Sequence, residues 1–89
     1  MADIIIKHER QTPIGWEYSV VIEGHDRTVE VDREYWHQLT HGHMQPADLV
    51  LRSLEFLLAQ EPVEEIQQRF NLREIKSYFP DYEDTVDHR

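Results

Sequence analysis

The feature that most restricts the fold is a strict alternation of residue types between positions 16 and 23. Apolar side chains fall at every second position, and the intervening side chains are mostly polar: Trp16, Tyr18, Val20 and Ile22 alternate with Glu17, Ser19, Val21 and Glu23. Successive side chains of a β-strand point to opposite faces. This segment therefore predicts a strand with one face in the core and the other in water.

Two further strands are predicted beside this one. Residues 4–9 begin with three consecutive isoleucines, and residues 28–32 alternate between apolar and polar side chains. Proline and glycine mark a turn at 11–15, and Gly24 marks a second turn at 24–26. The three strands together predict an antiparallel meander with one wet face.

The rest of the chain has helical spacing. Asp32 is a suitable cap for a helix that runs to about Thr40, and Pro46 suits the first position of a longer helix that reaches Gln60. Two shorter helices are predicted over 63–70 and 71–79. The fold class is therefore α+β: a three-stranded antiparallel β-meander followed by a helical C-terminal half packed on one sheet face.

These patterns also give a domain layout and a core. Residues 1–80 are expected to form a single domain, and residues 81–89 an acidic tail that frays. The expected core comprises Ile4, Ile6, Trp16, Tyr18, Val20, Ile22, Val29, Val31, Trp36, Leu39, Val50, Leu51, Leu54, Leu57, Leu58, Ile66, Leu72 and Ile75.

Composition narrows the function classes. The chain has no cysteine, which removes disulfides and thiolate chemistry and favours a cytoplasmic location. Its net charge of −9 argues against nucleic acids and anionic membranes as partners. The three glycines are isolated, and no serine lies in a nucleophile motif. We therefore expect no enzyme activity, no cofactor and no small-molecule substrate.

The long helix is apolar on two sides. Leu49 and Phe56 lie one heptad apart, opposite the main apolar stripe of residues 46–60. Two explanations are open: a protein partner or second copy covers this side, or the segment 63–79 does. The first makes the protein a non-catalytic interaction module, with a homodimer as one form.

Four residues form a candidate metal site. Glu34, His37 and His41 are three and four residues apart, so a helix would place them on one face, and His43 follows closely. The alternative is that these side chains face water, opposite Tyr35, and bind no metal in function.

Two parts of the chain resemble known proteins, one in the order of its elements and the other in its run of residues. Residues 27–60 read as a short strand, a helix, a tight loop and a longer helix, which resembles the ribbon-helix-helix of bacterial repressors and antitoxins. That resemblance implies a dimer that reads DNA through outward strand positions, here Thr28, Glu30 and Asp32. The run LEFLLAQEP with FNLREIKSYFPDYE resembles small bacterial proteins of unknown function, which implies no activity.

Overall fold

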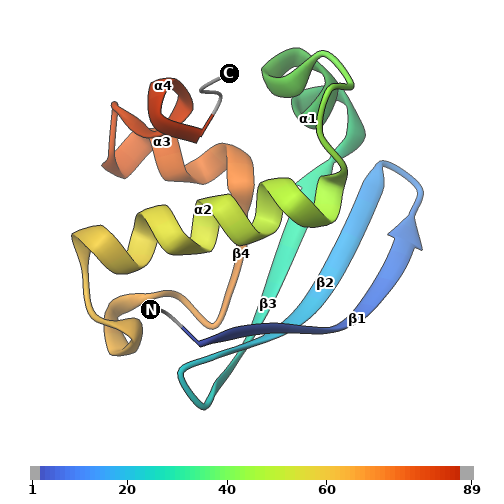
Figure 1. The fold of residues 1–89 in the computed structure, drawn as a ribbon. Helices are drawn as coiled ribbons and strands as arrows, with labels where there is room; N and C mark the ends of the chain where they lie inside the picture. The colour runs from blue at the N-terminus through green and yellow to red at the C-terminus, as the bar shows by residue number, and fades with distance from the viewer. Residues whose placement is uncertain (1–2, 87–89) are drawn as a thin grey trace.

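The computed structural model describes residues 3–86, and it has the α+β architecture predicted from the sequence (Figure 1). Three strands come first, β1 (Ile4–Thr12), β2 (Gly15–Ile22) and β3 (His25–Asp32). They are followed by α1 (Arg33–Thr40), α2 (Pro46–Gln60), the 3₁₀ turn η1 (Val63–Glu65), β4 (Arg69–Asn71), η2 (Leu72–Glu74), α3 (Ile75–Tyr78) and α4 (Tyr82–Val86). Among the described residues, no helix is long and apolar enough to cross a membrane.

The sheet has the strand order β1-β2-β3-β4 within residues 3–86. The first three strands form the antiparallel meander, and β4 adds to β3 in parallel through Phe70, which lies opposite Val29. A bulge between Ile6 and His8 interrupts the pairing of β1 with β2. The fourth strand was not predicted from the sequence, which favoured a helix over 63–70.

Two tight turns fix the meander. Glu23 and Gly24 both have positive φ, 49° and 84°. A two-residue hairpin turn whose twist matches that of its strands requires positive φ at both central residues. At Gly15 the limit is space, since a Cβ atom there would lie 2.0 Å from the carbonyl oxygen of Val31. This close approach lets the end of β3 lead directly into α1, where the Arg33 amide donates to the Ile14 carbonyl at 2.8 Å.

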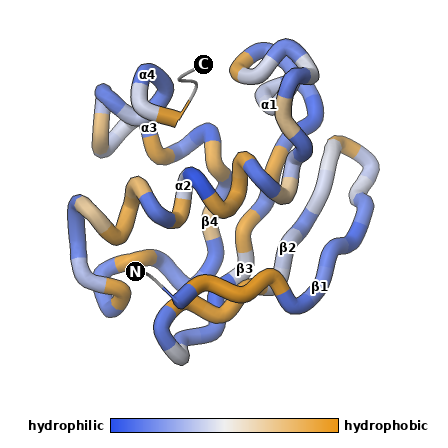
Figure 2. The backbone as a smooth tube through the Cα atoms, in the orientation of Figure 1, coloured by the Kyte–Doolittle hydropathy of each residue, from blue (hydrophilic) through white to orange (hydrophobic). Residues whose placement is uncertain are grey.

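The core lies between the sheet and the helices. The alternating face of β2 and β3 is fully buried through Tyr18, Val20, Ile22, Val29 and Val31. In Figure 1, α2 crosses this face, and α3 and α4 lie on the opposite side of α2 from the sheet. The hydropathy colouring of Figure 2 shows the same division, with apolar segments of the strands under α2 and more polar backbone around α1 and α4.

Two predictions for the C-terminal third were wrong. Residues 63–70 form one 3₁₀ turn and then enter β4, because Phe70 reaches the core as a strand residue opposite Val29. The acidic tail does not fray at residue 81: α4 packs on α2 with Tyr82 and Val86 buried. Residues 87–89 of the predicted tail lie outside the described part of the chain.

Candidate functional site

The second apolar side of α2 is covered by the chain itself. Leu49 is 0% exposed and Phe56 is 8% exposed. The ring of Phe56 packs against Phe79 and Tyr82, with centroids 5.9 and 5.5 Å apart. These two residues therefore offer no surface to a partner, and the intramolecular explanation accounts for the pattern that suggested one. The covering elements extend further than expected, because α4 takes part.

A buried hydrogen-bonded chain fixes α4 on α2. The Ser53 hydroxyl donates to the Leu49 carbonyl at 2.7 Å and lies 2.6 Å from the Tyr82 hydroxyl. Since the single proton of Ser53 is used on the carbonyl, the Tyr82 hydroxyl is the donor to Ser53. Burial raises the pKa of Tyr82, which keeps this proton in place. The end of the chain is thus held by a specific polar contact as well as by apolar packing.

The four residues of the predicted metal site are not brought together. Glu34 and His37 lie on α1, but the helix ends at Thr40, and His41 adopts a left-handed conformation with φ of 54°. His43 follows in the loop to α2, and all four side chains are exposed. Among residues 3–86, no group of three or more His, Asp or Glu side chains is arranged to hold a metal ion.

The strand that resembles a ribbon-helix-helix strand lies inside the sheet. That family pairs this strand with a second chain, but β3 is already bonded to β2 and to β4. Two of its outward carboxylates are used within the chain: Glu30 pairs with Arg69 at 2.7 Å, and Asp32 pairs with Arg73 at 3.3 Å. Asp32 does not cap α1 with its side chain, which also accepts a hydrogen bond from Asn71 at 3.0 Å.

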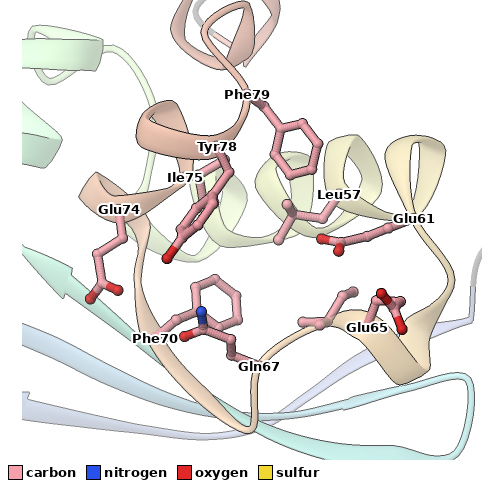
Figure 3. Close-up of a pocket in the computed structure, with 10 residues that line it drawn as sticks. Leu57, Glu61, Glu65, Gln67, Phe70, Glu74, Ile75, Tyr78 and Phe79 are labelled. Atoms are coloured by element: carbon pink, nitrogen blue, oxygen red, sulfur yellow. The ribbon is translucent and has the colours of Figure 1, made fainter.

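A cleft with a largely apolar lining lies in the C-terminal third, and we call it the acidic cleft. It has a volume of about 180 Å³ and opens between the end of α2, the loop through η1, β4 and α3 (Figure 3). Its walls are formed by Leu57, Glu61, Glu65, Ile66, Gln67, Phe70, Glu74, Ile75, Tyr78 and Phe79.

The acidic cleft has an apolar floor and a charged rim. Leu57, Phe70 and Ile75 belong to the buried core and form the bottom of the cavity. In Figure 3 the carboxylates of Glu61 and Glu65 lie together on one side, across the cavity from the Tyr78 ring. Tyr78 is 66% exposed, an unusual position for a large aromatic side chain. A ligand in the cleft would meet apolar surface below and negative charge beside it.

The carboxylates of Glu61 and Glu65 at the rim are not neutralised by any residue of the described part of the chain. Partial burial raises the pKa of Glu61, and the neighbouring Glu65 raises this pKa further. Neither carboxylate has an ion pair within residues 3–86. Glu61 also caps the C-terminus of α2, where the helix dipole adds negative potential. The site therefore favours a cation that is partly removed from water.

Arg27 holds the loop that forms one wall of the acidic cleft. This β3 residue donates from Nε to the Ile66 carbonyl at 2.9 Å and from a terminal nitrogen to the Val63 carbonyl at 3.2 Å. The Thr28 amide adds a bond of 2.9 Å to the Gln68 carbonyl. Because a charged donor strengthens a hydrogen bond, Arg27 fixes the loop between η1 and β4 in one conformation.

The sequence did not reveal the acidic cleft, although its lining residues all lie between positions 57 and 79, because the cleft forms only where the chain folds back from α2 through η1 and β4 to α3. The sequence predicts a helix over 63–70, which contains Glu65 and Phe70, and it assigns no role to Glu61 or Tyr78. The one available signal was a group of acids next to apolar residues around Pro62.

A scan against protein-family models, a search of curated proteins and a search of solved structures each found no match to this chain.

Proposed function

We propose that this protein is a non-catalytic interaction module whose acidic cleft binds a basic, amphipathic segment of a partner protein. The observation that carries the proposal is the pair of uncompensated carboxylates, Glu61 and Glu65, beside an apolar floor. A lysine or arginine side chain combines an apolar stem with a cationic end, so it matches both parts of the cleft.

The size of the cleft favours a protein side chain over a separate small molecule. Its volume of about 180 Å³ is below the roughly 300–1,000 Å³ typical of pockets for drug-sized ligands. One or two side chains of a docked segment would fill it, and the rest of the segment would lie across the rim.

Tyr78 supports the same interpretation. The residue is 66% exposed, and its ring lies at the mouth of the cleft, on the side opposite Glu61 (Figure 3). Tyrosine is enriched among the residues that dominate protein interfaces, because its ring buries apolar area while its hydroxyl keeps a polar contact. Docking of a partner would cover this ring.

The proposal is tested by NMR titration with a synthetic amphipathic helical peptide of lysine and leucine. We expect the amide signals of the acidic cleft to shift, and a peptide with glutamate in place of lysine to give no shift. The double variant Glu61→Gln/Glu65→Gln should weaken binding about tenfold, because two partly desolvated charge pairs are lost.

The matched control is Glu55→Gln/Glu64→Gln. These two glutamates are exposed and do not line the cleft, so the control removes the same charge elsewhere. It should bind the lysine peptide nearly as well as the unmodified protein does. Equal loss in both double variants would show attraction to the overall negative charge and would contradict the cleft as the binding site.

A further inference from the structure

The free edge of the sheet is a second interaction surface, independent of the acidic cleft. In the described chain, β1 is an outermost strand of the sheet and is bonded only to β2. Its first residues, Ile4–Ile6, form the apolar beginning of the strand seen in Figure 2. An edge strand presents unpaired amide and carbonyl groups that can bond to another strand.

The backbone pairing shows which groups are free. The Glu23 amide donates to the Asp3 carbonyl at 2.8 Å, so these two residues form a hydrogen-bonded pair. Bonded and non-bonded pairs alternate along an antiparallel ladder. The next pair, Ile4 with Ile22, is therefore non-bonded, and so is Ile6 with Val20. The amides and carbonyls of Ile4 and Ile6 point away from β2, toward the free edge.

We propose that β1 pairs with β1 of a second copy of this chain, antiparallel, with a twofold axis at Ile5. This register places Ile4 of one protomer opposite Ile6 of its partner, so the two edge-facing residues bond to each other on both sides of the axis. Ile5 then meets its own copy at a non-bonded position on the outer face of the sheet. Two bonded pairs give four new backbone hydrogen bonds.

The side chains fit this register. Ile5 is 52% exposed and lies beside the half-buried Val21, so pairing covers an apolar strip that now faces water. Asp3 and Lys7 lie two residues to either side of Ile5, so each Asp3 comes next to the partner's bulge residue Lys7, just beyond the last regular pair. Neither has an ion pair within residues 3–86, and their opposite charges select this register over neighbouring ones.

The bulge limits the assembly to a dimer. It interrupts the regular strand after Ile6, so the new ladder stays short. The other outermost strand, β4, has only three residues and offers no comparable edge. A twofold contact that uses the same strand in both protomers closes on itself.

The first test is a cross-link. The chain has no cysteine, so Ile5→Cys introduces a single thiol. Non-bonded antiparallel pairs hold their Cα atoms about 4.5 Å apart, which lies within the range that a disulfide spans. Mild oxidation should give a covalent dimer with this variant and much less with Ile14→Cys, whose parent residue is similarly exposed at 65% but lies in a turn. Equal yields, or no dimer from either variant, would overturn the proposal.

The second test is a charge exchange followed by sedimentation equilibrium. Asp3→Lys or Lys7→Asp alone brings like charges close together at both ends of the short ladder and should weaken association by about tenfold. The double exchange restores both pairs and should recover most of the association. An unmodified protein that stays monomeric at millimolar concentration, or a double exchange that fails to recover, would refute this register.

Discussion

Two glutamates of this protein have opposite electrostatic environments. On the outer face of the sheet, Glu17 accepts hydrogen bonds from Arg10, at 2.9 Å, and from Arg69, and these contacts hold its pKa below the usual range. At the rim of the acidic cleft, burial and Glu65 raise the pKa of Glu61. The first carboxylate is paired within the fold, whereas the second has no ion pair among residues 3–86.

The difference follows from where the two residues lie. Glu17 is on β2, a middle strand: Arg10 lies directly opposite it on the neighbouring β1, and Arg69 reaches it from β4, on the far side of β3. Glu61 ends α2, and the last turn of that helix contains no basic residue. Changes in the sheet should therefore alter stability and leave ligand binding intact, whereas changes around the cleft should alter binding.

The largest expected effect tests the sheet half of this comparison. Gly15→Ala would place a Cβ atom against the Val31 carbonyl and should lower the free energy of unfolding by about 3 kcal/mol. Gly24→Ala is the control, because its Cβ would meet open space and only the positive φ is strained, which should cost about 1 kcal/mol. Urea denaturation measures both, and equal losses would disprove the close approach at Gly15.

The next effect concerns the contact that joins α4 to α2. Ser53→Ala leaves the Tyr82 hydroxyl buried without its partner and should cost about 2 kcal/mol of unfolding free energy. Tyr82→Phe removes that hydroxyl and should cost about 1 kcal/mol. Both changes loosen the elements that carry Phe79 above the cleft, so peptide affinity should also fall. If both variants bind the peptide with unchanged affinity, the shape of the cleft does not depend on the Ser53–Tyr82 contact.

A pH series should give opposite signs for the two glutamates. A lowered pKa means that ionised Glu17 stabilises the fold above the ordinary carboxyl pKa, and this contribution is lost as the pH falls through the lowered value. A raised pKa means that ionised Glu61 destabilises the fold once the pH exceeds the raised value.

At neutral pH, Glu17→Gln should therefore be less stable than the unmodified protein, and Glu61→Gln more stable. Both differences should shrink at acidic pH, where the native carboxyls are protonated. Thermal melting over a pH series measures these differences, and the same sign for both variants would remove the basis of the comparison.

The smallest expected effect is on proton release. A cationic segment that pairs with Glu61 lowers its raised pKa, so binding should release protons at pH values between the ordinary carboxyl pKa and the raised one. Affinity for the lysine peptide should accordingly rise with pH in that range. Calorimetry in buffers of different ionisation enthalpy detects the release, which should be absent in Glu61→Gln.

The sequence predicted best where the signal was local. The alternation through β2 identified the buried face residue by residue, since neighbouring side chains carry the whole pattern. The turn at Glu23 and Gly24 was placed within a residue or two. The segment predicted as a helix over 71–79 begins with an Asn71–Glu74 capping box, in which the Asn71 amide lies 3.3 Å from Glu74 Oε2.

Prediction failed where burial depends on a distant segment. β4 has three residues, and it is a strand only because Phe70 meets Val29, about forty positions earlier in the chain. Tyr82 and Val86 are four residues apart in an acidic stretch, too few to indicate a helix without a surface to receive them. The sequence did identify that surface through Leu49 and Phe56, although its cover came from the same chain.

The position of α4 has a consequence for synthesis on the ribosome. The second apolar side of α2, which carries Leu49 and Phe56, stays uncovered until Tyr82 and Val86 have been synthesised and can pack against it. When the meander and α2 have emerged from the ribosome but α4 has not, Leu49 and Phe56 are exposed to water. Folding should therefore be completed only after residue 86 has left the exit tunnel, and products of premature termination should be substrates for chaperones and proteases.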